Sequence, residues 1–220
     1  MLLTEDITAI ILSGGQGSRM DGKDKGLVCY QNKPLIKHVI DRISPQVKDI
    51  VISCNRNHDS YADYGFPITS DLNSSNSSSH SQEPSYQGPI YQGPSYQGPF
   101  YQGPLAGIQA GLNIVKTKAA IIVPCDSPNI PKDLVKRLRL QLDENKISVA
   151  IPSDGTRIQP LFSLITMAVK EPLNDYLLSG QRKAELFFRQ QKPEIVDFSD
   201  LAKHFLNFNT IQSLQDSDSH

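Results

Sequence analysis

A short apolar run that leads directly into a glycine-rich loop constrains the fold of this chain more than any other feature. Ile7–Leu12 is rich in β-branched residues, which predicts a buried β-strand. Three glycines follow within residues 13–17, where they allow a sharp backbone turn and bring N–H groups close to a ligand. Arg19 and Lys25 add positive charge shortly afterwards. A strand that ends in such a loop predicts a binding site for a polyanion, for which a nucleoside triphosphate is the best candidate.

Neither of two familiar phosphate-binding loops matches this segment. The Walker A loop requires Gly-Lys followed by Ser or Thr, whereas Gly22 and Lys23 are followed by Asp24. The dinucleotide-binding loop requires a third Gly or Ala at the position that Met20 occupies. A P-loop NTPase and a Rossmann dehydrogenase are therefore both disfavoured.

The rest of the chain alternates between apolar runs and segments of helical periodicity, which is the pattern of an α/β fold with a largely parallel sheet. The runs expected to form strands are 7–12, 49–54, 119–124, 147–151 and 161–165. Pro34 is expected to open a helix, and two later helices are expected to align apolar residues over 105–115 and 134–142. Ligands of such open sheets bind beyond the carboxyl ends of the strands, so the loops that follow strands are the places to look for chemistry.

Composition narrows the classes of protein to which the chain can belong. Residues 1–220 suit a single domain, and a formal net charge of −1 without a basic block gives no electrostatic reason to expect a nucleic-acid partner. The three cysteines form no CxxC pair, so neither a zinc site nor a disulfide framework is indicated, and Cys125 is expected to be a small apolar filler. The chain shows no secretion signal and no run of membrane-spanning length. We expect a cytoplasmic monomer without a membrane partner.

The middle of the chain differs in composition from the rest. Residues 73–85 are rich in Ser and Asn, a composition that buries too little surface to order itself. A five-residue repeat of Tyr-Gln-Gly-Pro plus one residue follows, with copies that begin at Tyr86, Tyr91, Tyr96 and Tyr101. The period is too short for a solenoid, and its prolines and glycines favour turns or extended chain. We expect 73–100 to be a dispensable surface insertion; the alternative is a tyrosine-rich segment that binds a partner.

Polar residues near the ends of the predicted strands are the candidates for chemistry. Asp126 could hold Mg²⁺, which proteins bind through one or two carboxylates together with substrate phosphate oxygens; helix capping is the alternative role. Lys25, oriented by Asp24, could neutralise triphosphate oxygens, unless it is a solvated surface lysine. Asn55 lies beyond the second predicted strand, where an amide could contact a base edge.

A resemblance to a known family is carried by the complete opening string, which is Leu12-Ser13-Gly14-Gly15-x-x-x-Arg19-Met20-x-Gly22-x-Asp24-Lys25-Gly26-Leu27. It resembles the opening of the molybdenum cofactor guanylyltransferases, members of the wider nucleotidyltransferase family. Further segments match that family in the same order, namely Gly-Pro-Leu-Ala-Gly at 103–107, Cys-Asp-x-Pro at 125–128, the segment 157–162, Gly-x-Arg-Lys at 180–183 and Asn-x-Asn-Thr at 207–210. The resemblance covers nearly the whole chain apart from about 73–100.

The resemblance implies a three-layer α/β sandwich with a mostly parallel, Rossmann-like sheet of the nucleotide-diphospho-sugar transferase type. It implies transfer of GMP from GTP to the molybdenum–molybdopterin cofactor with release of pyrophosphate, Mg²⁺ as the cofactor, and transient contact with cofactor-insertion or client molybdoenzymes. The residues that it assigns to the nucleotide are Leu12, Ser13, Gly14, Gly15, Lys25, Asn55, Asp71, Gly103, Pro104, Leu105 and Asp126. Those that it assigns to catalysis are Arg19, Lys25 and Asp126, with Asp126 as the metal ligand. Those that it assigns to the pterin substrate are Arg182, Asn207 and Asn209.

Several of these assignments leave an alternative open. Asp71 could instead be a turn residue that begins the insertion, and the pterin-side residues could be a basic helix end and Asn turns. Ser53 stands where the family often has an asparagine, which leaves the base contact of Asn55 open. Rival functions are a cytidylyltransferase acting on the same pterin, a sugar-phosphate nucleotidylyltransferase, and a non-catalytic nucleotide-binding scaffold that delivers the cofactor. Gly-Ser-Arg-Met and Asp-Lys differ from the motifs of the sugar enzymes, which disfavours that rival.

Overall fold

A central β-sheet runs through the computed structural model, which describes residues 2–14, 24–70, 91–92, 103–142 and 147–208. Within these residues eight strands pair in the order β10-β8-β9-β7-β1-β4-β5-β6. Their bounds are β1 Ile7–Leu12, β4 Asp49–Ser53, β5 Ile68–Ser70, β6 Tyr91–Gln92, β7 Ala119–Pro124, β8 Val149–Ser153, β9 Leu164–Thr166 and β10 Glu194–Asp197. All neighbouring strands are parallel except that β9 is antiparallel to both β7 and β8.

The order of the strands places a topological switch point at β1. The chain leaves β1 for β4, β5 and β6 on one side and then returns to β7 on the other. Thr8 pairs with Asp49 across the first junction and with Ala120 across the second. Loops that leave β1 and β7 therefore diverge at the carboxyl edge of the sheet, which is where α/β proteins of this kind bind their ligands.

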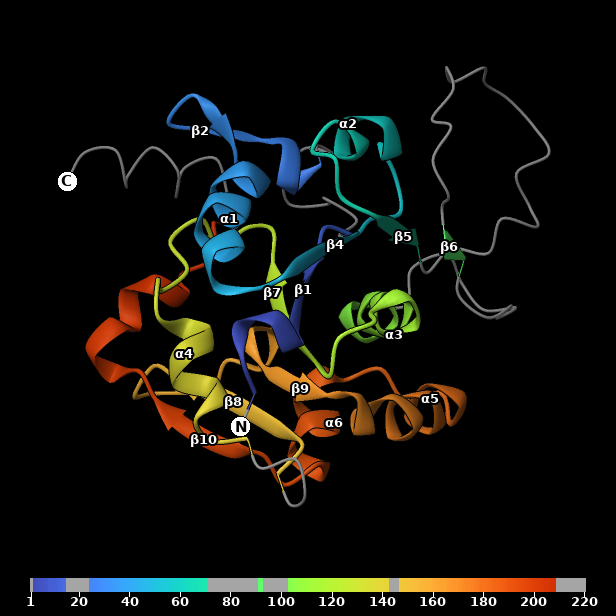
Figure 1. Ribbon diagram of the computed structural model, residues 1–220, viewed down its shortest axis with the longest axis vertical. Helices are drawn as coiled ribbons and strands as arrows, with labels where there is room; N and C mark the ends of the chain where they lie inside the picture. The colour runs from blue at the N-terminus through green and yellow to red at the C-terminus, as the bar shows by residue number, and fades with distance from the viewer. Residues whose placement is uncertain (1, 15–23, 71–90, 93–102, 143–146, 209–220) are drawn as a thin grey trace.

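Helices cover both faces of the sheet, as Figure 1 shows, and this arrangement makes the molecule a three-layer sandwich. The helices are α1 Leu35–Ile43, α2 His58–Ala62, α3 Pro104–Ile114, α4 Leu134–Arg139, α5 Lys170–Leu178 and α6 Ala184–Gln190. One core cluster joins Ile36 of α1 and Leu134 of α4 to Ile11 of β1. The other joins Ile108 of α3 and Leu173 of α5 to Ile10, the neighbouring residue that points to the opposite face.

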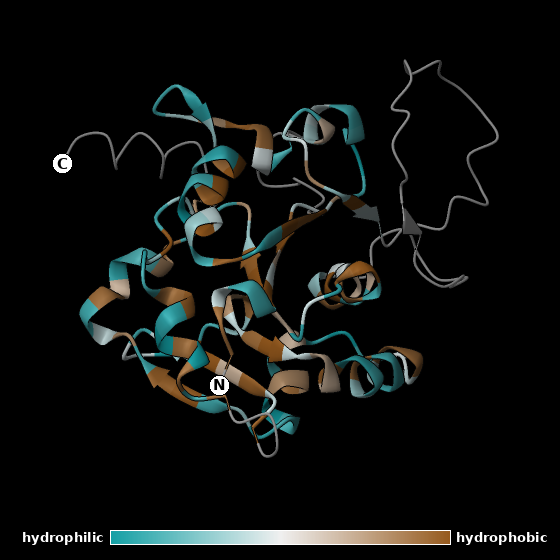
Figure 2. Ribbon diagram, in the orientation of Figure 1, coloured by the Kyte–Doolittle hydropathy of each residue, from teal (hydrophilic) through white to brown (hydrophobic). Residues whose placement is uncertain are grey.

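The central strands are apolar on both faces because helices bury both. The first five residues of β1 and all six of β7 are buried, and Figure 2 shows these strands mostly in the hydrophobic colour. Continuous apolar runs of this kind are typical of parallel sheets, whereas strands with one solvated face alternate. The predicted three-layer α/β fold is confirmed.

The expected elements match the observed ones closely at the centre of the sheet and less closely at its margins. The strands predicted at 7–12 and 119–124 have the observed bounds. The strand predicted at 161–165 is wrong in position: Pro160–Phe162 forms a 3-10 turn, and β9 begins at Leu164. The helix expected after Pro34 is α1, whereas the two later predicted helices end early, α3 at Ile114 and α4 at Arg139. Leu142 is still buried, so its apolar character reflects packing beyond the helix.

A small hairpin and the end of the described chain pack together beside the sheet. Strands β2 (Cys29–Tyr30) and β3 (Lys33–Pro34) form the hairpin. The ring of Tyr30 lies 5.0 Å from that of Phe208, and both pack with Leu35. This contact holds the segment after the 3-10 helix Ser199–Phe205 against the N-terminal half of the molecule. Among the described residues no helix is long and apolar enough to cross a membrane.

Candidate functional site

Backbone hydrogen bonds bring the loops after β1, β4 and β7 together at the carboxyl edge of the sheet. The N–H of Ser13 donates to the carbonyl of Ser53 at 2.7 Å, and the N–H of Cys125 donates to the carbonyl of Leu12 at 3.1 Å. Ser13 is buried and Gly14 half-buried. Leu12, Ser13 and Gly14, all predicted nucleotide contacts, therefore lie directly beside the segment that carries Asp126.

Lys25 and Asp126 form an ion pair at this edge. Nζ of Lys25 lies 3.0 Å from Oδ2 of Asp126, and their side chains are 22% and 11% exposed. Lys25 begins the 3-10 turn Lys25–Leu27, whose first N–H groups need a capping acceptor. Asp24 supplies it by accepting a hydrogen bond from the N–H of Gly26. The pair places a cation and a carboxylate side by side at the switch point, so Lys25 is not a solvated surface lysine.

One oxygen of the Asp126 carboxylate is left for another ligand. Oδ2 accepts the hydrogen bond from Lys25, whereas Oδ1 is buried and has no hydrogen-bond partner within the described part of the chain. The alternative of helix capping does not hold, because α4 begins only at Leu134 and Asp133 precedes it. A buried carboxylate oxygen without a donor fits a cation, since burial of such an atom unpaired is costly.

The residues present fit Mg²⁺ rather than a metal that needs an all-protein cage. The described residues include no group of three or more His, Cys, Asp or Glu side chains that could enclose a metal. Mg²⁺ commonly takes only one or two carboxylates and completes its shell with water and substrate phosphate oxygens. Asp126, with its buried Oδ1, fits the role of a protein ligand to Mg²⁺.

Asn55 lies at the other side of the Ser13–Gly14 loop. Its Oδ1 accepts a hydrogen bond of 3.0 Å from the hydroxyl of Ser70. A Cβ atom at Gly14 would come within 3.2 Å of Nδ2 of Asn55, so the two residues are in close contact. This arrangement puts an amide beside the loop that is expected to hold the nucleotide.

The start of α3 approaches the same loops. Gly103 precedes the helix with φ +81°, a left-handed conformation that favours glycine, and Pro104 occupies the first helical position. Leu105 is buried in the core cluster on this face. Ser53 is also buried, and a Cβ atom at Gly107 would lie 2.8 Å from its hydroxyl oxygen. A small residue at 53 thus sits directly beneath the first turns of α3.

Asn207 is held next to Asp126 by two contacts. The hydroxyl of Ser127 donates to Oδ1 of Asn207 at 2.5 Å, and the N–H of Phe208 donates to the carbonyl of Asp126 at 2.9 Å. Asn207 is itself exposed. Two segments about 80 residues apart in sequence therefore meet at the edge of the sheet, which brings one predicted pterin contact to the predicted metal ligand.

Arg182 has a structural role in the described contacts. Its Nη1 donates to the carbonyl oxygens of Leu177, at 2.8 Å, and Gln181, at 2.7 Å. Leu177 belongs to the last turn of α5, where carbonyl groups lack intrahelical partners. The helix-end alternative for Arg182 is thus realised, and a contact with the pterin remains a prediction.

The family of the chain is shown by comparison with known proteins. A family model described as a MobA-like NTP transferase domain matches residues 9–82 and 95–195. The chain belongs to this family. It is 37% identical over 209 residues to a molybdenum cofactor guanylyltransferase from Shewanella sediminis, covering 95% of this chain and 94% of the relative. The corresponding protein from Shewanella piezotolerans is 36% identical over 213 residues, with 97% and 92% covered.

Solved structures show the same fold at lower sequence identity. The molybdopterin-guanine dinucleotide biosynthesis protein A from Archaeoglobus fulgidus superposes with a TM-score of 0.70 at 20% identity, covering 96% of this chain and 97% of that one. A nucleotidyl transferase from Methanothermobacter thermautotroptrophicus superposes with a TM-score of 0.67 at 14% identity, covering 97% and 96%. The fold of this member of the MobA-like family is therefore that of a nucleotidyltransferase.

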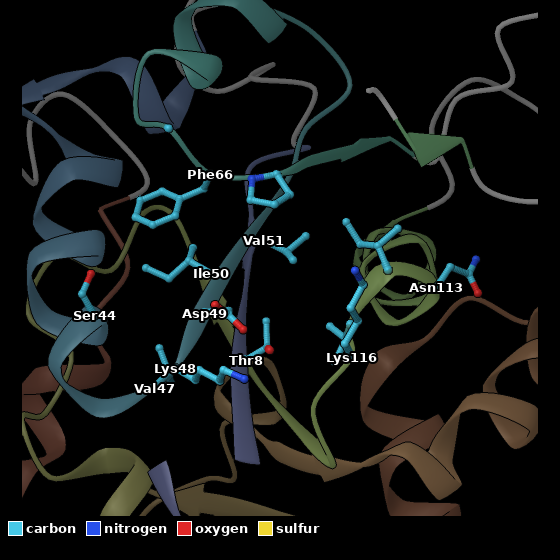
Figure 3. Close-up of a pocket in the computed structure, with 14 residues that line it drawn as sticks. Thr8, Ser44, Val47, Lys48, Asp49, Ile50, Val51, Phe66, Asn113 and Lys116 are labelled. Atoms are coloured by element: carbon cyan, nitrogen blue, oxygen red, sulfur yellow. The ribbon is translucent and has the colours of Figure 1, made fainter. Parts of the chain in front are cut away.

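A cavity of about 680 Å³ lies away from the candidate site residues. Figure 3 shows Thr8 and Asp49, near the amino ends of β1 and β4, Asn113, near the end of α3, and Lys116, just beyond that helix, around it. The site residues follow the opposite, carboxyl ends of β1 and β7. The cavity therefore belongs to the other edge of the sheet.

Some residues that shape the site carry no sequence motif. Ser70 and Ser127 hold the side chains of Asn55 and Asn207, but serine in a loop is too common to single out. Tyr61 donates to Asp24 at 2.6 Å across 37 residues of sequence. Residues 58–62 are mostly polar and show no apolar periodicity, so the sequence gives no signal that Tyr61 is buried. Gly15, Arg19, Asp71 and Asn209 lie outside the described residues, and their predicted roles stay predictions.

Proposed function

We propose that this protein is a molybdenum cofactor guanylyltransferase, which transfers GMP from GTP to the molybdenum–molybdopterin cofactor and releases pyrophosphate. The observation that carries the proposal is the Lys25–Asp126 ion pair at the β1–β7 switch point, with one buried carboxylate oxygen left unpartnered by the described residues. Relatives above 35% identity over nearly the whole chain bear the guanylyltransferase name, which favours GTP over CTP as the donor.

The chemistry requires positioning and charge stabilisation rather than a covalent nucleophile. The terminal phosphate of the pterin attacks the α-phosphorus of GTP, and the bond from that phosphorus to pyrophosphate breaks. The backbone N–H groups of Gly14 and Gly15 are the proposed donors to the nucleotide phosphates, since the N–H of Ser13 already donates to the carbonyl of Ser53. Lys25, with Arg19, stabilises the charge on the departing pyrophosphate.

Asp126 is the proposed ligand of Mg²⁺. When bound, Mg²⁺ shields the negative charge of the phosphate oxygens and makes the phosphorus more open to attack. The two oxygens of Asp126 can serve both needs, because Oδ2 holds Lys25 and Oδ1 faces no donor among the described residues. The carboxylate thus keeps Lys25 in place while it holds the metal.

Asn55 and the 103–105 segment are proposed to contact the guanosine moiety of GTP, together with Asp71. The hydrogen bond from Ser70 fixes Oδ1 of Asn55, and Nδ2 of Asn55 lies close to Gly14. Asn207, next to Asp126 through Ser127, is proposed to bind the pterin with Arg182 and Asn209. The two substrates would then meet over the Lys25–Asp126 pair.

Pyrophosphate release tests the proposal. Purified protein is incubated with Mg²⁺, molybdenum-loaded pterin cofactor and one of GTP, CTP, ATP or UTP. We expect release with GTP and little with the other three. Release with CTP alone would show that the protein is a cytidylyltransferase. Nucleotide binding without pyrophosphate release would support a non-catalytic scaffold instead.

A further inference from the structure

Asp24 is a nearly buried carboxylate that precedes Lys25 but bonds to other groups. Its side chain is 5% exposed. Oδ1 accepts hydrogen bonds from the hydroxyl of Tyr61, at 2.6 Å, and from the N–H of Gly26. Oδ2 accepts one from Nδ2 of Asn57 at 2.9 Å and lies 3.5 Å from Nε of Arg56. A buried carboxylate with this many partners fixes the segments that supply them to one another.

Those partners join the turn that carries Lys25 to the start of α2. Gly26 belongs to the Lys25–Leu27 turn, whereas Asn57 caps α2 and Tyr61 lies inside it. Asn57 has φ +54°, a left-handed conformation that asparagine adopts more readily than most non-glycine residues. Its side chain donates the hydrogen bond to Asp24 from this position. Helix α2 therefore supports the Lys25–Leu27 turn, which we call the lysine turn.

The phenol of Tyr61 fills the space on the inner side of this turn. Tyr61 is fully buried, and a Cβ atom at Gly26 would lie only 2.5 Å from its hydroxyl oxygen. The same Cβ atom would lie 3.4 Å from Sγ of Cys125, the residue before Asp126. The hydroxyl of Tyr61 thus lies where the lysine turn approaches the segment that carries the metal ligand. This close approach explains why residue 26 is a glycine.

We propose that Tyr61 and Asp24 are positioning residues that hold Nζ of Lys25 against Asp126. Neither needs to touch a substrate, since both act through the backbone of the Lys25–Leu27 turn. The proposal rests on the proposed function for its kinetic consequence, but the placement of Lys25 can be measured without turnover.

The kinetic test is a double-mutant cycle with the full-length protein. Tyr61→Phe and Asp24→Asn keep side-chain volume and remove the hydroxyl donor or the charge. We expect each to lower kcat by about 10–100-fold, because a misplacement of about 1 Å costs on that order, with a smaller change in KM for GTP. In a Lys25→Ala background the same changes should have almost no further effect. Equal losses in both backgrounds would show a general structural role and overturn the proposal.

The second readout is the rate at which acetic anhydride modifies Lys25, followed by peptide mass spectrometry. We expect Tyr61→Phe to raise this rate by about threefold or more, because a loosened turn opens locally and exposes the amine. The rate at Lys33, which pairs with Asp41 on the surface, should stay unchanged. Tyr64→Phe, on the segment just after α2, is the matched control and should leave both readouts as in the wild type.

The two readouts separate failure of this proposal from failure of the proposed function. A wild-type protein without GTP turnover, but with faster acetylation of Lys25 in Tyr61→Phe, would refute the function and support the positioning role. Unchanged acetylation of Lys25 would overturn the positioning role whatever the activity. If Tyr61→Phe fails to fold, Asn57→Ala removes one partner of Asp24 at an exposed position, and the same outcomes apply to it.

Discussion

At the level of single residues, the two oxygens of the Asp126 carboxylate make different contacts. Asp126 pairs with Lys25 through Oδ2 and leaves Oδ1 buried without a partner in the described part of the chain. Removal of either charged group should therefore remove a contact that matters most when charge develops on the leaving pyrophosphate. Such contacts are worth more in a partly buried site than on the surface.

We predict that Lys25→Ala and Asp126→Ala each lower kcat by about 10²–10³-fold, the usual loss for one charge-stabilising contact. Turnover should be measured by pyrophosphate release, with circular dichroism as the check on folding. Lys33→Ala removes a surface lysine that is 55% exposed and serves as the control. Near-normal turnover in both site variants would show that the site lies elsewhere.

A second prediction at this scale concerns the three thiols. Burial raises the pKa of both the Cys54 and the Cys125 thiols, whereas Cys29 is exposed. A raised pKa leaves even less reactive thiolate at pH 8 than an ordinary cysteine has. Iodoacetamide at pH 8 should therefore add one group, at Cys29, until urea unfolds the protein, and intact-mass and peptide analysis can follow this. Equally fast labelling of Cys125 would contradict its assignment as a buried filler.

At the scale of elements, α3 brings its first turn to the site because two glycines let it lie close to the sheet. A Cβ atom at Gly107 would lie 2.8 Å from Oγ of Ser53, and one at Gly111 would lie 2.8 Å from two carbons of Ile10. The helix therefore packs against β1 and β4 with backbone rather than side chains. Its N-terminal Gly103 is thereby held at the carboxyl edge of the sheet.

We predict that Gly111→Val lowers the free energy of unfolding by about 1–3 kcal/mol, because extra carbons in a packed core force the neighbours to move. Urea unfolding followed by circular dichroism measures this change. Asn113→Val makes the same side chain on an exposed position of α3 and should change the stability much less. Equal effects of the two variants would mean that the valine acts through helix propensity and not through the contact with Ile10.

The helices and strands that could be predicted from the sequence are those whose own residues determine where they begin and end. Strands β1 and β7 are buried on both faces, so their continuous apolar runs mark their bounds directly. The prediction of a strand at 161–165 was wrong. Phe162 is apolar because it packs against Phe205 in the core, and it does not belong to a strand. Apolar character alone does not separate these two cases.

The site residues that could be predicted from the sequence are those that belong to motifs. Lys25 and Asp126 stood out through their place in recognisable strings, and their ion pair agrees with a shared site. The contacts of Tyr61 with Asp24 and of Ser127 with Asn207 join positions 37 and 80 residues apart and depend on the packed fold. No sequence pattern marks such pairs, because either residue alone is ordinary at its position.

At the level of the whole molecule, the gap between the two halves of the family match lies inside the proposed insertion at 73–100. The family model covers 9–82 and 95–195, so the unmatched residues 83–94 hold the first copy of the repeat and most of the second. Within the described residues, Tyr91–Gln92 adds a two-residue strand to the edge of β5. A strand at the edge of a sheet contributes to one neighbour only, so its removal leaves the central pairing intact.

We predict that deletion of residues 85–99 leaves folding and turnover close to the wild type. The deletion keeps the Gly-Pro-Leu-Ala-Gly segment that begins α3 at Pro104. Thermal unfolding and pyrophosphate release measure the two effects. Loss of either would show that the repeat belongs to the fold or to the site, and that it is not dispensable.

We propose that nucleotidyl transfer takes place over the Lys25–Asp126 pair at the switch point of the sheet. The most direct test gives the protein GTP labelled with ³²P at the α- or the γ-phosphate, together with Mg²⁺ and molybdenum-loaded pterin cofactor, and separates the products. We expect the α label to appear in the pterin dinucleotide and the γ label in pyrophosphate, and we expect both products to nearly vanish in Asp126→Ala. Release of the γ label as inorganic phosphate, with no α label in the pterin product, would contradict this proposal.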